Sequence, residues 1–130
     1  MTRQITALCL GALAAAGVLC GATDSRAGQS FTEASCWGDS TGGSCEGTLT
    51  SFRNSSDQNA YAEFWQGYGS YGGFQGQVNG RYYSCQLSAQ LYPAVAAQWP
   101  QAMGARGYFA VNWDKNGYCS QLFIVNGSQY

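Results

Sequence analysis

Short runs in which apolar and polar residues alternate, separated by glycine, asparagine and aspartate, dominate the chain after Ser30. Alternation with a period of two is typical of a β-strand with one buried face, and frequent turn residues indicate strands joined by hairpins. Thr48 to Phe52 and Tyr61 to Trp65 therefore predict two strands, with a polar loop between them. The glycine-rich segment 67–73 interrupts regular structure after the second strand.

Two hairpins are predicted, each from a turn that accepts positive φ angles. Asn79-Gly80 suits a type I′ turn, and Gly117 suits the left-handed position after a type I turn. The strands expected on the two sides of these turns are 74–78 with 81–85, and 108–113 with 118–126. The run from Leu122 to Val125 is apolar at every position, so we expect a central strand that is covered on both faces.

One short helix is expected between the hairpins, because four apolar side chains fall four residues apart, as on one helix face: Leu91, Val95, Trp99 and Met103. Pro93 suits a first helical turn. Pro100 cannot donate to the carbonyl of Ala96, so the helix should end near Trp99 or kink there, and Gly104 is a natural stop. The fold class is therefore mainly β, a small α+β domain: an antiparallel sheet or a partly closed barrel of about five to seven short strands.

The first residues follow a different pattern. Arg3 precedes an apolar run from Ile5 to Ala22, and a polar stretch then leads to Ala27. This order is typical of a secretory signal peptide. We therefore expect residues 1–27 to be cleaved and residues 28–130 to form a single secreted or periplasmic domain, with no membrane association after cleavage. The alanine and glycine content favours a signal of bacterial type over a retained membrane anchor, and the residues before Cys20 do not suit a lipoprotein.

Four cysteines follow the predicted signal peptide: Cys36, Cys45, Cys85 and Cys119. An even number of cysteines in an oxidising compartment predicts two disulfides, which would stabilise a domain of about 100 residues. Three pairings are possible. We favour Cys36 with Cys45, which closes a short loop over the glycine-rich segment 38–43, and Cys85 with Cys119, which would link two strands. The paired two-residue spacing of a zinc ribbon is absent from the sequence, so no zinc site is predicted.

Charge and residue type exclude several function classes. The chain has six basic and seven acidic residues and no basic run, so neither nucleic acid nor an anionic membrane surface is an expected partner. It has no histidine, which removes the usual general base and the commonest metal ligand. A pair of carboxylates could hydrolyse a glycoside, and the candidates by residue type are Glu46, Asp57, Glu63 and Asp114. We nevertheless expect a protein that is not an enzyme and binds no cofactor or metal ion.

Aromatic residues are the main peculiarity of the composition. The four Trp, nine Tyr and six Phe all follow Ser30, and many lie among Gly and Gln between Tyr61 and Tyr83. Flat rings beside amide groups can stack on sugars or anchor a protein partner, although strands also bury aromatic side chains in their cores. The candidate binding surface predicted from this segment is Trp65, Tyr68, Tyr71, Phe74, Tyr82 and Tyr83.

Three hypotheses about function follow. The first is an exported, non-enzymatic binding domain that uses this aromatic surface on a protein or glycan at the cell surface. The second is a structural surface protein whose Tyr/Gly/Gln-rich edges associate with copies of themselves. The third is a small carboxylate-dependent hydrolase. The sequence specifies neither the ligand nor the oligomeric state.

Overall fold

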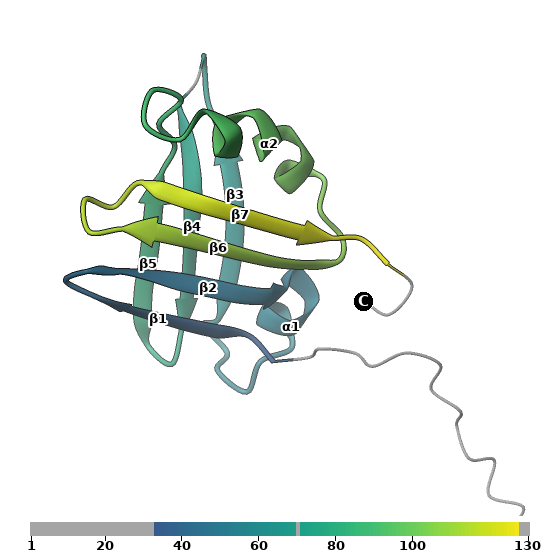
Figure 1. Cartoon of the computed structure of the whole chain (residues 1–130). Helices are drawn as coiled ribbons and strands as arrows, with labels where there is room; N and C mark the ends of the chain where they lie inside the picture. Colours follow the sequence, from purple (N-terminus) through teal and green to yellow (C-terminus); the bar gives the residue numbers. More distant parts are fainter. Residues whose placement is uncertain (1–32, 70, 128–130) are drawn as a thin grey trace, which may run out of the picture.

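The computed structural model describes residues 33–69 and 71–127, which form seven strands and two helices (Figure 1). In chain order these elements are β1 (Ser35–Asp39), β2 (Gly42–Thr48), α1 (Leu49–Arg53), β3 (Tyr61–Gln66), β4 (Gly72–Val78), β5 (Arg81–Gln86), α2 (Pro93–Met103), β6 (Tyr108–Asp114) and β7 (Cys119–Val125). The strands make two antiparallel sheets, with the orders β1-β2-β6-β7 and β3-β4-β5. The predicted mainly β fold is confirmed. The described strands stay in two sheets and do not close into a barrel.

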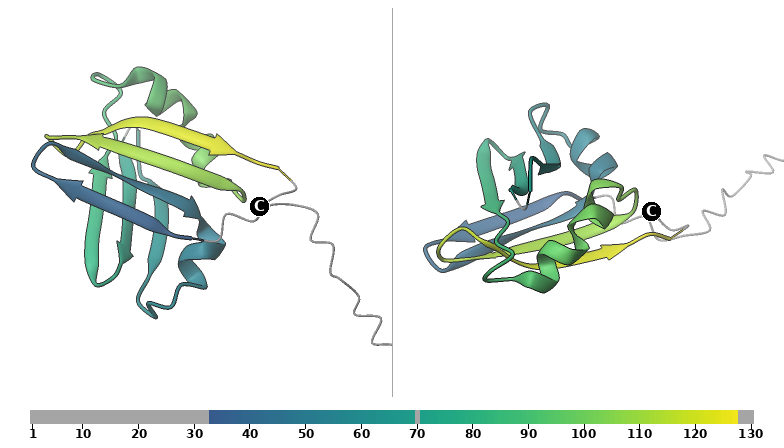
Figure 2. Two further views of the ribbon diagram at one scale, coloured as in Figure 1. Left: turned by 60° about the horizontal axis from the view of Figure 1, so that its bottom comes forward. Right: turned by 90° about the horizontal axis from the view of Figure 1, so that it is seen from above.

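The two sheets face each other, and the strands of one run across those of the other (Figures 1 and 2). Aromatic rings fill the space between them. Phe64 and Phe74 come from the three-stranded sheet, and their ring centroids lie 5.0 Å and 5.7 Å from that of Phe109 in the four-stranded sheet. Because the domain has few leucines and isoleucines, these rings supply much of the apolar area whose burial stabilises the fold.

The segment from Thr48 to Phe52, predicted as a strand, is mainly the short helix α1, so that prediction was wrong. Thr48 caps the helix: the Ser51 N–H donates to Oγ1 of Thr48 at 2.8 Å, and the Thr48 N–H donates to Oγ of Ser51 at 2.9 Å. This reciprocal capping box satisfies two backbone donors that a helix start would otherwise leave unpaired. Five residues of alternating polarity fit a strand or a helical turn equally well, and here the capping bonds and the burial of Phe52 decide in favour of the helix.

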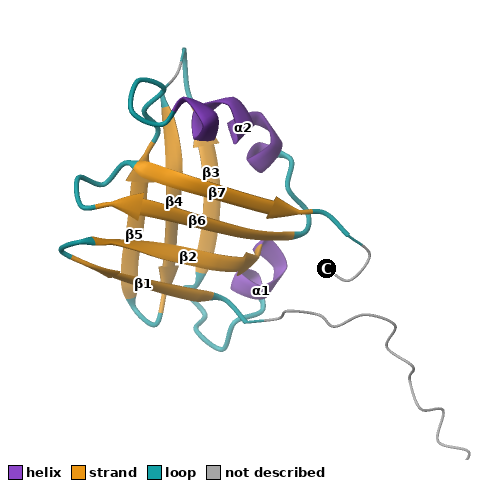
Figure 3. Ribbon diagram, viewed as in Figure 1, coloured by secondary structure: helices purple, strands orange, loops and turns teal. Residues whose placement is uncertain are grey.

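Helix α2 extends to Met103 and contains Pro100, whereas we predicted an end or a kink near Trp99; the expected stop at Gly104 is confirmed. The buried face also differs from the four-residue spacing, because it consists of Val95, Trp99 and Ala102, while Leu91 and Met103 are exposed. A helix repeats every 3.6 residues, so positions four apart drift around the axis and Met103 turns away from the core, while Leu91 precedes the first residue of the helix. Both helices lie at the margins of the sandwich (Figure 3).

The segment 38–43, predicted as a glycine-rich loop, is the tip of a tight hairpin between β1 and β2. The backbone N–H and the hydroxyl of Thr41 both donate to Oδ1 of Asp39, at 2.7 Å and 2.6 Å, which stabilises the turn. Cys36 and Cys45 stand directly opposite each other in this hairpin and form the predicted disulfide. The bond therefore joins neighbouring strands and does not close an irregular loop.

Both hairpins predicted from their turns are confirmed: β4 with β5, and β6 with β7. Asn79 and Gly80 have φ angles of 53° and 72°, and Gly117 has a φ of 78°. The prediction that Leu122 to Val125 forms a central strand was wrong, because β7 is an edge strand. Leu122 and Ile124 pack against the core, but Phe123 points outward and is 59% exposed. Strand order is set by pairing between distant segments, which a local apolar run does not report.

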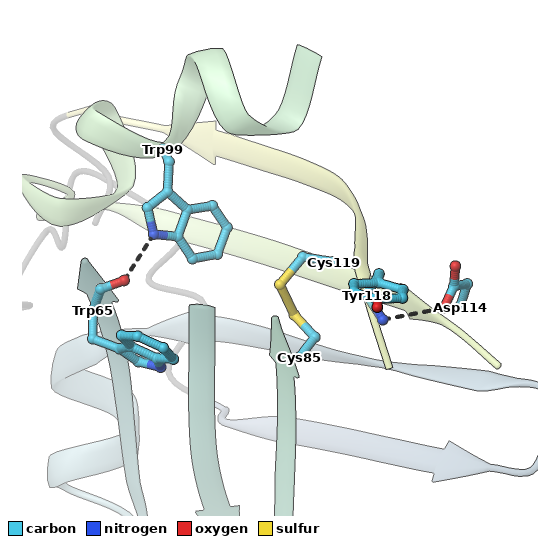
Figure 4. Close-up of a disulfide and its surroundings, with 6 residues drawn as sticks. All are labelled: Trp65, Cys85, Trp99, Asp114, Tyr118 and Cys119. Carbon is cyan, nitrogen blue, oxygen red and sulfur yellow. Dashed lines mark hydrogen bonds between the residues drawn. A yellow bond between two sulfur atoms is a disulfide. The ribbon is translucent and has the colours of Figure 1, made fainter. Parts of the chain in front are cut away.

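The second predicted disulfide, Cys85 to Cys119, is also confirmed, and it connects β5 to β7 (Figure 4). Beside it, the Gln86 N–H donates to the Gly117 carbonyl at 2.9 Å, so one backbone bond and one covalent bond tie the two sheets together at this corner. None of the described helices is long and apolar enough to cross a membrane. The predicted signal peptide, residues 1–27, lies outside the described residues.

Candidate functional site

The outward side of the three-stranded sheet carries two residues of the predicted surface, Trp65 and Tyr82, together with Tyr61 and several amide side chains. Cross-strand pairing arranges them in three rows: Tyr61, Gln77 and Tyr82; Glu63, Gln75 and Ser84; Trp65, Gly73 and Gln86. We call these nine residues the aromatic–amide face. Because side chains alternate between the two sides of a strand, the residues between them point inward to the core.

The structure separates the six predicted surface residues into two groups. Phe74 is completely buried and Tyr83 is 9% exposed, so both belong to the core and the prediction was wrong for them. The other four, which are at least partly exposed, are Trp65, Tyr68, Tyr71 and Tyr82. Tyr82 and Tyr83 show the reason most directly. They are adjacent in β5, so they lie on opposite sides of the sheet.

At one end of the face, the indole of Trp65 lies over Gly73. A Cβ atom at Gly73 would collide with the carbonyl oxygen of Cys85 and would stand 3.1 Å from Cζ2 and 3.2 Å from Cε2 of Trp65, so the glycine makes room for both the neighbouring strand and the ring. The ring of Tyr71 meets Trp65 edge to face, with 5.0 Å between centroids. The Trp65 backbone is held as well, because Nε1 of Trp99 donates to its carbonyl oxygen at 3.1 Å (Figure 4). These contacts hold an aromatic pair in one place at the end of the sheet.

At the other end, Tyr61 and Tyr82 flank Gln77. The Tyr82 hydroxyl donates to Oε1 of Gln75 at 2.8 Å, which orients that amide and leaves its Nε2 hydrogens free by valence to donate elsewhere. Burial raises the pKa of the Tyr61 hydroxyl above its ordinary value, and the neighbouring Tyr82 and Glu63 add to the rise. Tyr61 is therefore a neutral hydrogen-bond donor near pH 7.

Glu63 is the one ionisable carboxylate among the nine residues of the face, and the rest are amides, hydroxyls, rings and a glycine. The two aromatic ends stand four residues apart along β3, which is about 13 Å at the rise of an extended strand. Rings at the ends with hydrogen-bonding groups between them suit an extended, flat and polar ligand. The arrangement offers stacking and hydrogen bonding, with little electrostatic attraction.

The prediction omitted Tyr61, Gln75, Gln77 and Gln86, which belong to this face. A usable signal was present in the sequence. In 74–78, Gln75 and Gln77 alternate with inward-facing Phe74, Gly76 and Val78, so period two assigns the glutamines to the outer side. The aromatic residues identified the correct segment. Grouping all six as one surface ignored the alternation of side chains between the two sides of a strand.

The four carboxylates considered for hydrolysis lie on separate parts of the fold. Glu46 is on the outer side of the other sheet, where it accepts a hydrogen bond from the Tyr108 hydroxyl at 2.6 Å. Asp57 accepts from the Asn59 N–H at 3.0 Å and the Gly80 N–H at 3.3 Å, which connects the loop after α1 to the β4–β5 turn. Glu63 belongs to the aromatic–amide face, and Asp114 to the β6–β7 turn. Within residues 33–69 and 71–127, no group of three or more potential metal-ligating side chains comes together.

Asp114 has a structural role at its turn, and this predicts a pH dependence. The Tyr92 hydroxyl donates to Oδ2 at 2.8 Å and lowers the pKa of the Asp114 carboxyl; the N–H groups of Tyr118 and Asn116 lower it further. A carboxyl whose folded pKa is depressed stabilises the fold above its unfolded pKa of about 4, and this contribution is lost as the pH falls through the folded value. We expect Asp114→Asn to flatten the acid side of the melting temperature profile, measured by circular dichroism.

The matched variant for this test is Tyr92→Phe, which removes the first donor but keeps the carboxylate and its backbone partners. Its acid limb should lie between those of the parent protein and Asp114→Asn. A melting profile for Asp114→Asn that stays parallel to the parent profile at every acidic pH would contradict the assignment.

A cleft of about 310 Å³ opens beside the aromatic–amide face, between β1 and β5. Asp39 and Arg81 line it together with Tyr83 and Trp113, whose ring centroids are 6.2 Å apart. Tyr82 and Ser84 border both the cleft and the face, so a ligand on the face could extend into it. Comparisons with protein-family models, with curated protein sequences and with solved structures find no match to this chain.

Proposed function

We propose that the chain is an exported, non-enzymatic binding protein and that its aromatic–amide face recognises a neutral polysaccharide. The single observation that carries this proposal is the arrangement of the face, in which the rows with aromatic rings at both ends enclose one hydrogen-bonding row, Glu63, Gln75 and Ser84, on one side of a sheet. A sugar ring presents apolar C–H groups on its faces and hydroxyls on its edge, which are the complements of these groups.

The charge of the face favours a neutral ligand over an acidic one. Glu63 would repel an anionic chain. Arg81, the basic residue of β5, is not one of the nine residues of the face, so no basic side chain within the face offsets this charge. A carboxylate can also accept hydrogen bonds from sugar hydroxyls, so Glu63 suits an uncharged glycan. Since few ions are involved, binding should change little between low and moderate ionic strength.

Export is supported by the two disulfides, which are compatible with an oxidising compartment. It is also supported by the signal-like pattern at the start of the sequence. A protein exposed outside the cytoplasm meets polysaccharides at the cell surface, which fits the chemistry of the face.

The test uses the oxidised protein without residues 1–27 and measures intrinsic tryptophan fluorescence during titration with soluble xylan, galactomannan, dextran and hydroxyethyl cellulose. At least one neutral polymer should shift the emission saturably. Trp65→Ala and Tyr82→Ala should each weaken that binding by about tenfold or more, because each removes one stacking ring. Polygalacturonate serves as the acidic comparison and should bind more weakly.

The control variant is Phe123→Ala, which removes a similarly exposed aromatic side chain from the other sheet. It should bind as the parent protein does. If none of the neutral polymers shifts the emission, or if Trp65→Ala binds as tightly as the parent, the glycan proposal is wrong. Light scattering in the same experiment would detect self-association, the competing role for exposed rings.

A further inference from the structure

The four-stranded sheet has a polar row of its own on the side away from the core. Register places Trp37 opposite Ser44, Ser44 opposite Asn112, and Asn112 opposite Gln121, so four strands contribute one side chain each. We call these residues the Trp37 row. Trp37 is 57% exposed, although an indole of this size gains free energy from burial. Its neighbours in the row are a hydroxyl and two amides.

A depression of about 410 Å³ lies along this row, within the size range of small-molecule sites. Its lining includes all four residues of the row together with Thr41 and Ser120, and none of its lining residues is charged. Ser120 lies where the β6–β7 register shifts, between the pairs Asn112 with Gln121 and Trp113 with Cys119. Such bulges reorient side chains and are frequent next to functional sites.

The two amides in the row are already oriented. Nδ2 of Asn112 donates to Oε1 of Gln121 at 2.8 Å. By valence, Asn112 keeps Oδ1 as an acceptor and a second hydrogen on Nδ2, while Gln121 keeps two hydrogens on Nε2. Donors and acceptors therefore stand in fixed places beside an exposed flat ring. A single uncharged ring that carries hydroxyl groups can satisfy both kinds of partner and stack on Trp37.

We propose that this depression is a second binding site and that it takes one uncharged pyranose residue. Its volume suits a single sugar, whereas the aromatic–amide face suits a chain. The uncharged lining disfavours sugar acids and amino sugars, because an ionised group would lose its hydration without gaining a charged partner. The site lies on the other sheet, so binding there does not depend on binding at the aromatic–amide face.

The test is a titration of ¹⁵N-labelled oxidised protein with methyl glycosides of glucose, galactose, mannose and N-acetylglucosamine. The indole N–H signal of Trp37 and the side-chain amide signals of Asn112 and Gln121 should shift saturably with at least one of them. The dissociation constant should be in the millimolar range, as expected for one small polar ligand. Glucuronate and glucosamine should shift these signals less.

Trp37→Ala should weaken this binding by about tenfold or more. The variant should fold, because the ring that it removes is largely exposed. Phe123→Ala is the matched control: it truncates an exposed ring on the same side of the same sheet, in a different row, and should leave the titration unchanged.

Three results would overturn the proposal: no shift of the three reporter signals with any glycoside, equal binding by Trp37→Ala, or shifts that follow protein concentration instead of glycoside. The last would mean that a second copy of the chain covers Trp37. Failure here is distinguishable from failure at the aromatic–amide face, because the side-chain signals of Trp65, Gln75 and Gln77 report on that face in the same spectra.

Discussion

Trp99→Ala is expected to lower the free energy of unfolding by about 3–5 kcal/mol, a large part of the stability of a domain of this size. Trp99 is completely buried, and its ring meets Phe64 edge to face at 5.4 Å between centroids. The substitution leaves a large cavity between α2 and the sheets. It also leaves the carbonyl of Trp65 without its indole donor.

Urea denaturation monitored by far-ultraviolet circular dichroism measures this loss. Met103→Ala is the matched control, since it truncates a side chain of the same helix that is 47% exposed, and it should change the unfolding free energy little. Trp99→Phe separates the two contributions, because it keeps a ring in the core and removes the hydrogen bond. A Trp99→Ala protein as stable as Met103→Ala would mean that α2 does not close the core.

Removing the disulfide between the sheets, in the double variant Cys85→Ala/Cys119→Ala, is expected to cost about 4 kcal/mol. The two cysteines are 34 residues apart, and a cross-link of that span strongly restricts the unfolded chain. Both cysteines are also buried in the core, at 2% and 0% exposure, so the variant loses packing as well. Its melting temperature should fall by tens of degrees, since 1 kcal/mol corresponds to about 4–8 °C in a small domain.

The comparison variant is Cys36→Ala/Cys45→Ala. Its cysteines are only 9 residues apart and already face each other in a tight hairpin, so the same chain-entropy reasoning gives about 3 kcal/mol. Calorimetry on both variants, and on the parent protein with and without reductant, measures which disulfide contributes more to the stability of the fold. Equal losses for the two pairs, or a parent protein whose melting is unchanged after confirmed reduction, would contradict this account.

The sequence predicted best the features that depend on neighbouring residues. Asn79-Gly80 and Gly117 identify their hairpins because positive φ angles are restricted to few residue types. The cysteine pairing was also predicted correctly, from the short glycine-rich loop expected between Cys36 and Cys45 and from the two strand-like segments that carry Cys85 and Cys119. Helix α1 was mistaken for a strand because five residues carry too little periodicity, although its Thr48–Ser51 capping pair was visible.

Features set by contacts between distant segments were not predictable in the same way. The edge position of β7 depends on β6 pairing with β2 on its other side, which no local pattern around Phe123 contains. For the candidate site, the sequence identified the aromatic segment but did not distinguish the residues on the outer side of the sheet from those in the core. The Trp37 row was missed entirely, since its members come from four strands and share no motif.

The four-stranded sheet is made from both ends of the described chain, and the three-stranded sheet lies between them in sequence (Figure 1). The consecutive strands β3, β4 and β5 can pair as soon as they are synthesised, whereas β2 cannot pair with its second neighbour until β6 is synthesised. During synthesis from the amino end, Cys45 follows Cys36 after 9 residues, whereas Cys119 follows Cys85 only after 34. The cross-link between the two sheets therefore cannot form before β7 begins, when every other described strand has already been synthesised.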